Sequence, residues 1–151
     1  MRVAGHGISI DVPPGWEARV FRRRGGGAVL HVATFELLGG DGDFGAAATG
    51  RMRGDDVFAA LIEYRVDDRL RAGVGLFAAA GLPAPPEVHE FNPMQLQVTR
   101  RGQVGRQRFF THDSRPYCLY LVIQPVDRPM ERMTGELSNV LATLQLPGGS
   151  P

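Results

Sequence analysis

Three arginines followed by three glycines form the group of residues in this chain with the clearest binding chemistry. Arg22, Arg23 and Arg24 directly precede the glycines at 25–27, and alternating segments flank the run on both sides. Guanidinium groups pair with carboxylates and phosphates, and the bare amides of a glycine turn can cradle the same anions. Alternatively, the arginines only keep an exposed hairpin soluble and its edge unpaired. Arg22, Arg23 and Arg24 are therefore candidate binding residues for an anion or a protein partner.

A histidine, a carboxylate and a guanidinium are sequence neighbours at His112, Asp113 and Arg115. An acid–base role requires a nucleophile or a substrate pocket within hydrogen-bond reach of the imidazole. A tight turn at the end of a sheet rarely supplies one, and an aspartate in such a turn bonds its own backbone. We therefore favour a simple turn.

The histidines and the cysteine lack the spacing of a metal or catalytic site. His6, His31, His89 and His112 are spread along the chain without a His-Glu-x-x-His or EF-hand pattern. Cys118 lies in the most apolar segment, where burial raises the pKa of a thiol, so we expect a structural thiol. Neither a Gly-x-Ser-x-Gly elbow nor a dinucleotide fingerprint occurs. We expect no catalytic residue, no metal and no cofactor.

Length, composition and charge restrict the class of protein. The 151 residues fit one domain, and 20 glycines with 11 prolines indicate many turns and a sheet-rich fold. The formal net charge of +1 is far from that of a dedicated nucleic-acid or anionic-membrane binder. All 17 basic residues are arginines, a bias typical of a high-GC bacterium. Since no transmembrane span or signal peptide is recognisable, we expect a cytoplasmic protein that binds neither nucleic acid nor membrane.

Hydrophobic periodicity predicts a sheet of six or seven antiparallel strands. Residues 117–123 are almost uninterrupted aromatic and aliphatic side chains, which suits a strand covered on both faces. Residues 55–64 also fit helical spacing, but we interpret them as a strand because their aromatic and branched residues are so concentrated. The expected strands are 7–12, 17–22, 28–36, 55–64, 95–99, 106–112 and 117–123.

After Pro125 the period changes to that of an amphipathic helix. Apolar residues recur at steps of three and four up to Leu144. Asp127 is a suitable N-cap and Pro129 suits the first turn, so we predict a helix from Pro129 to Leu144 that covers the sheet. Residues 147–151 are expected to be a flexible tail.

Residues 65–93 form a long excursion rich in glycine and proline, with one helical turn expected at 76–80. Long loops often carry an interface, so Leu76 and Phe77 are further candidate binding residues, either for another protein or for copies of this chain. Alternatively, the excursion covers a small-ligand or catalytic pocket to which His89 or His112 contributes.

The order of these elements resembles the PsbP-like fold. The resemblance rests on an N-terminal strand, the corner Val-Pro-Pro-Gly-Trp at 12–16, successive antiparallel strands, a late apolar strand and one C-terminal helix. That fold is shared by an extrinsic subunit of photosystem II, a Ran-binding nuclear import factor and many small bacterial proteins. It implies a binding or adaptor role and transfers no active-site residue to this chain.

Together these patterns predict a single α+β domain over residues 1–146, an antiparallel sheet packed by a C-terminal amphipathic helix. The leading hypothesis for function is a non-catalytic cytoplasmic binding or scaffold protein that acts through protein–protein contacts. The alternative is a small-ligand-binding or catalytic domain with a pocket between the sheet and residues 65–93.

Overall fold

The structure is a computed structural model, and it describes residues 1–67 and 70–148. In chain order the helices and strands are β1 (Arg2–Gly5), β2 (Ile8–Asp11), β3 (Glu17–Arg22), β4 (Ala28–Ala33), α1 (Ala46–Gly50), β5 (Val57–Glu63), β6 (Val104–His112), β7 (Arg115–Ile123) and α2 (Met130–Leu141). Three 3₁₀ turns, η1 (Gly75–Phe77), η2 (Val88–Glu90) and η3 (Pro93–Gln95), lie between β5 and β6.

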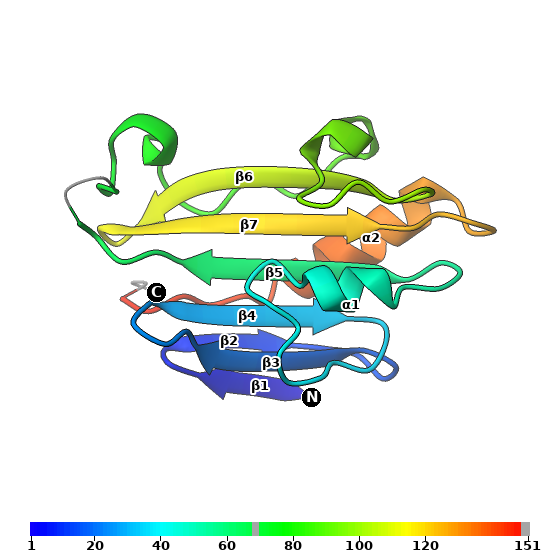
Figure 1. The fold of residues 1–151 in the computed structure, drawn as a ribbon, viewed down its shortest axis with the longest axis horizontal. Helices are drawn as coiled ribbons and strands as arrows, with labels where there is room; N and C mark the ends of the chain where they lie inside the picture. The colour runs from blue at the N-terminus through cyan, green and yellow to red at the C-terminus, as the bar shows by residue number, and fades with distance from the viewer. Residues whose placement is uncertain (68–69, 149–151) are drawn as a thin grey trace.

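The chain forms an α+β domain, as the sequence predicts, but its strands belong to two sheets. Five antiparallel strands pair in the order β3-β4-β5-β7-β6, and β1 pairs with β2 in a separate hairpin (Figure 1). The apolar strand β7 is hydrogen-bonded on both sides, by β5 and β6, and its residues 116–123 are all buried. Residues 57–63 form a strand rather than a helix, also as predicted.

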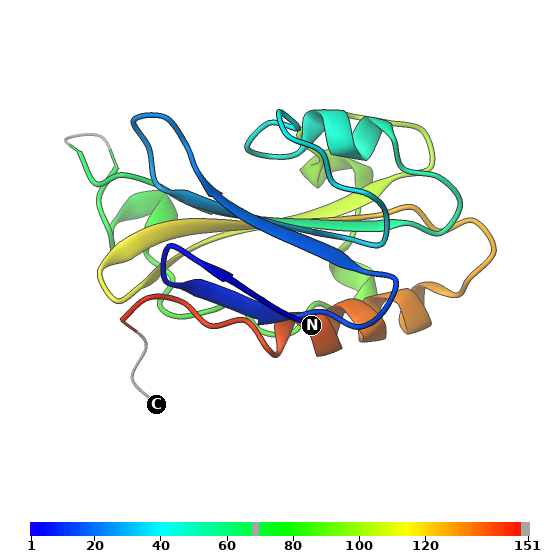
Figure 2. The same ribbon diagram turned by 90° about the horizontal axis from the view of Figure 1, so that it is seen from below.

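Both faces of the five-stranded sheet are covered (Figure 2). On one face, α2 and the β1–β2 hairpin pack over a core that includes Leu121, Met133 and Leu137. On the other face, α1 and its neighbouring loops cover Phe58 and Tyr120. Burial on both faces explains why β5 and β7 show apolar runs in place of an alternating pattern.

Helix α2 is shorter than predicted, because the chain leaves it to pair with the N-terminal hairpin. The helix ends at Leu141, and the backbone of Gln145 exchanges two hydrogen bonds with Ser9, of 2.8 and 3.0 Å. The predicted N-cap, Asp127, is wrong, since Pro129 occupies the cap without a side-chain hydrogen bond. The carboxylate of Asp55 orders this turn by accepting three successive backbone N–H groups, from residues 126–128.

Two predicted strands need correction. Residues 95–99 form no strand; η3 and irregular chain lie there, and the Gln95 side chain contacts β6 by accepting from the backbone N–H of Gln107 at 2.9 Å. A backbone bridge to β6 forms earlier in the chain, between Asn92 and Gly105. The strand at 28–36 ends at Ala33. Of the tail, Pro147 lies beside Gly7, and residues 149–151 are outside the described part of the chain.

The excursion wraps around the free edge of β6. Ala80 pairs with Thr111 near one end of that strand, and Asn92 pairs with Gly105 near the other. Between these bridges the chain crosses to the α2 face, where residues 82–86 lie against the helix. The excursion therefore occupies an edge that would otherwise be open to pairing with another chain. Within the described residues, no helix has the length and apolarity needed to cross a bilayer.

Candidate functional site

The structure brings the two sequence-predicted groups of binding residues to one end of the sheet. Strand register places Arg22 opposite Ala28 at the end of the β3–β4 pair, on the side of the sheet where β5 ends at Glu63. The turn between β6 and β7 lies at the same end. The β3–β4 hairpin and η1 are both found at the left of Figures 1 and 2.

A row of stacked side chains connects the hairpin to η1. The guanidinium of Arg23 lies over the ring of Tyr64, 5.3 Å from its centroid, and this ring is 5.4 Å from that of Phe77. Burial raises the pKa of Tyr64 to about 12, so its phenol is neutral. Phe77 is 2% exposed, whereas Leu76 is 61% exposed. Leu76 can therefore contact a partner, and Phe77 supports it from within.

Arg23 has a structural role that its exposed neighbours do not share. Its Nη2 donates a 2.6 Å hydrogen bond to the carbonyl of Glu63, and its Nη1 pairs with Asp43 at 3.3 Å. Arg22 and Arg24 are exposed and form no ion pair with any residue that the structure describes. Of the three predicted arginines, Arg23 fixes the hairpin and the other two remain available for binding.

The hairpin lies close against β5 because residue 27 is a glycine. A Cβ at Gly27 would overlap the backbone carbonyl of Glu63, so no larger residue fits without displacing one of the two strands. The carboxylate of Glu63 also accepts from the backbone N–H of Ala28, at 3.3 Å. This close approach sets the position of the arginines relative to the end of β5.

A basic hollow of about 340 Å³ lies between the hairpin, β5 and the β6–β7 turn. Arg22, Arg23, Arg65 and Arg115 line it, together with the glycines of the hairpin. Glu63 is the one carboxylate among the described residues that line it, and it pairs with Arg115 at 3.1 Å. The hollow therefore carries an excess of positive charge, which favours an anionic group.

Apolar side chains are exposed at the same end of the sheet. Val66, which lines the hollow, is 59% exposed, and Val74 and Leu76 in the excursion are each 61% exposed. Together we call this the hairpin-end surface, which consists of Arg22, Arg24, Arg65, Val66, Val74 and Leu76. Exposed aliphatic side chains beside exposed arginines are a pattern found at protein-binding surfaces.

The turn at His112 is a tight hairpin turn, and the described residues there form no acid–base pair. Asp113 and Ser114 have positive φ angles of 48° and 60°, as in a tight two-residue hairpin turn. In the described part of the chain, no hydrogen bond joins His112 to Asp113. His89 is exposed, and its Nδ1 lies 3.4 Å from the carboxylate of Glu87. Neither histidine lines the cavity that lies between residues 82–86, strand β6 and helix α2.

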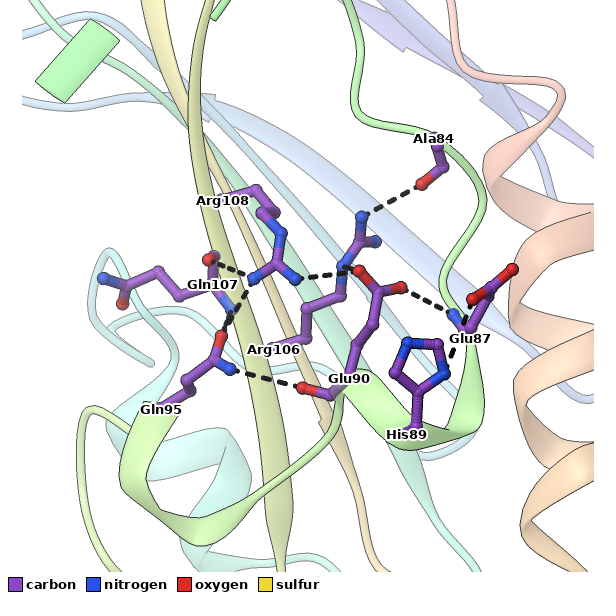
Figure 3. Close-up of polar contacts among 8 residues, drawn as sticks. All are labelled: Ala84, Glu87, His89, Glu90, Gln95, Arg106, Gln107 and Arg108. Atoms are coloured by element: carbon purple, nitrogen blue, oxygen red, sulfur yellow. Dashed lines mark hydrogen bonds and ion pairs between the residues drawn. The ribbon is translucent and has the colours of Figure 1, made fainter.

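A buried charge cluster on β6 was not predicted from the sequence (Figure 3). The side chain of Arg106 is 3% exposed, and its Nε lies 3.5 Å from Oε2 of Glu90. Arg108 donates to the same oxygen at 2.8 Å. The alternation of side chains along the strand could have indicated the burial of Arg106, because Arg106 shares a sheet face with the buried Phe110.

The described residues contain no group of three or more histidine, cysteine, aspartate or glutamate side chains placed to hold a metal. Burial raises the pKa of the Cys118 thiol to about 12, so at neutral pH it is protonated and unreactive.

Comparison with family models, with curated proteins and with solved structures finds no match for this chain. The resemblance to the PsbP-like fold thus stays a prediction, and functional inference rests on the residues themselves.

Proposed function

We propose that this protein is a non-catalytic, cytoplasmic binding protein that recognises an acidic segment of a protein partner through its hairpin-end surface. The observation that carries the proposal is the hollow that four arginines line, in which the single carboxylate among the described residues is already paired. Arg22 and Arg24 provide charge-assisted hydrogen bonds to acidic side chains. The neighbouring Val66, Val74 and Leu76 add apolar contact area.

The rigidity of this surface also supports binding. Arg23 is held by two polar contacts and by stacking on Tyr64, so the hairpin is fixed before a partner arrives. Preorganisation lowers the entropy cost of association. A partner that fits presents carboxylates to the hollow and aliphatic side chains to η1.

The test is affinity purification of the tagged protein from extract of its native cells, followed by mass spectrometry. One stoichiometric partner is expected with the wild-type chain and with the control pair Arg53→Glu and Arg101→Glu. The pair Arg22→Glu and Arg24→Glu should lose it. The control arginines are exposed and lie near the opposite end of the sheet, before β5 and β6, and the two pairs change the net charge equally.

Light scattering on the purified chain separates a foreign partner from self-association. A monomer that gains one partner only in extract supports the proposal. Equal capture by the two charge-reversed pairs would contradict it, because binding would then follow net charge or another surface. A dimer that persists in Arg22→Glu and Arg24→Glu would also contradict it, since this result places assembly elsewhere.

A further inference from the structure

A second, more enclosed cavity lies beneath the excursion, on the opposite edge of the sheet from the hairpin. It has a volume of about 180 Å³ and lies between residues 82–86, strand β6 and helix α2. Leu119, Leu141 and prolines of the excursion supply most of its wall. Arg106 and Ser138 carry the only polar side chains among the described residues that line it. An apolar cavity with one or two polar groups is typical of a small-ligand site.

Arg106 contributes a charge to this cavity that its neighbours do not fully neutralise. Two guanidinium groups, from Arg106 and Arg108, share the single carboxylate of Glu90. The Nη1 of Arg106 is buried without a hydrogen-bond partner among the described residues. Guanidinium remains charged at any ordinary pH, and a buried donor without a partner is costly. The site therefore favours an added anion.

Arg106 is also the only hydrogen-bond anchor between residues 82–86 and the described chain. Its Nη2 donates to the carbonyl oxygen of Ala84 at 3.0 Å (Figure 3). Three of these five residues are prolines, which have no backbone N–H to donate. The segment therefore closes over the guanidinium through one neutral carbonyl, and a carboxylate can compete for that contact because its charge strengthens the bond.

We propose that this cavity binds a small monocarboxylate whose carboxylate group contacts Arg106 and whose apolar body lies against Leu119 and Leu141. The volume equals that of about six water molecules at about 30 Å³ each, which suits a body of about four to six carbons. Because the Nη1 of Arg106 is buried, entry requires residues 82–86 to move away from Arg106. The site lies apart from the hairpin-end surface and does not depend on it.

The experiment is a titration of the ¹⁵N-labelled full chain with sodium hexanoate at millimolar concentration, observed by amide chemical shifts. Saturable changes are expected at Ala84, Ser138 and Leu141. The neutral analogues hexanamide and 1-hexanol should bind at least about tenfold more weakly, because they offer no charge to Arg106. Equal affinity for the acid and its amide would overturn the proposal, as would the lack of any saturable change.

Three variants locate the site. Arg106→Met removes the charge and should abolish the preference for the acid over the amide. Ser138→Leu places carbons in the cavity from the helix side and should weaken hexanoate binding while Arg106 stays in place. Arg132→Met is the matched control, because it removes an exposed charge from helix α2 but does not line the cavity, so it should keep the affinity. Wild-type affinity in folded Ser138→Leu protein would refute the cavity as the site.

Discussion

At the scale of single residues, His31 shows how burial sets a protonation state. Its ring lies between Phe21 and Phe58, with ring centroids 5.1 Å from each. Burial lowers the pKa of His31 below its usual 6.5, against the raising effect of a 2.9 Å hydrogen bond to the carbonyl of Asp43. A carbonyl only accepts, so Nε2 carries the proton of the neutral imidazole.

This shift predicts a pH dependence of stability. The pKa of His31 is lower in the folded protein than in the unfolded chain, so the unfolded chain binds more protons. The contribution of neutral His31 to the stability of the folded protein is therefore complete only above the unfolded pKa of about 6.5. The free energy of unfolding should therefore fall as the pH drops from about 7 to about 5. Urea unfolding across this range should give a shallower slope for His31→Gln. The same slope in both proteins would show that His31 does not control the effect.

Asp41 is a second buried ionisable residue, and its contacts organise the loop after β4. Its side chain is 3% exposed and accepts from Arg51 at 2.6 and 3.1 Å and from the backbone of Leu38 at 2.9 Å. The hydrogen bond from Arg51 lowers the pKa of Asp41 more than burial raises it. The contribution of Asp41 is therefore present above its unfolded pKa and lost only in strong acid.

We expect Asp41→Asn to lower the free energy of unfolding by about 1 to 3 kcal/mol, since Arg51 keeps some access to water when the pair is broken. Chemical denaturation measures this loss. Asp11→Asn is the control, because the Arg2–Asp11 pair is 3.9 Å apart and about half exposed on both sides, so its loss should cost less than about 1 kcal/mol. Equal losses in the two variants would contradict the buried role of Asp41.

At the scale of elements, the contact between the β3–β4 hairpin and β5 depends on Gly27. We expect Gly27→Ala to lower the melting temperature and to separate Arg23 from Tyr64, because the added methyl overlaps the Glu63 carbonyl. Thermal unfolding and the change in tyrosine fluorescence measure the two effects. Gly135→Ala, in α2 where a Cβ meets nothing, should instead raise stability by about 0.5 to 1 kcal/mol. An unchanged melting temperature and unchanged tyrosine fluorescence in Gly27→Ala would contradict the close packing.

The elements also show which features can be read from sequence. Strands β5 and β7 were predictable because burial on both faces leaves an apolar run in the sequence itself. Residues 95–99 alternate like a strand, but the chain has already paired Asn92 with β6, and Pro93 has no N–H to continue a ladder. The sequence could not show this competition for one sheet edge.

The two candidate sites were predictable to different degrees, because one depends on neighbouring residues in the sequence and the other on long-range contacts. Arg22 and Arg24 lie two residues apart on a local hairpin, so their shared exposure follows from nearby sequence. Arg106 becomes a site residue only through the distant Ala84 and Glu90, and the excursion that positions these has no regular period. Its burial therefore depends on long-range contacts that local patterns do not record.

At the scale of the whole molecule, the hairpin end of the sheet is locally basic although the net charge is only +1. Four arginines gather around the hollow at the hairpin end, and Glu63 is the only carboxylate among the described residues of its lining. Binding through exposed arginines should weaken at high salt, because the screening length falls from about 8 Å at physiological ionic strength to about 3 Å at 1 M. A small chain can thus present a strongly basic surface while its total charge stays near zero.

Hydrogen–deuterium exchange on the complex with the captured partner tests most directly that the hairpin-end surface is the binding surface. Residues 22–27, 63–66 and 74–77 should exchange more slowly in the complex than in the free chain, while the turns before β5 and β6 at the opposite end remain unchanged. Protection confined to those opposite turns, or to the corner at 13–16 beside α2, would contradict the account.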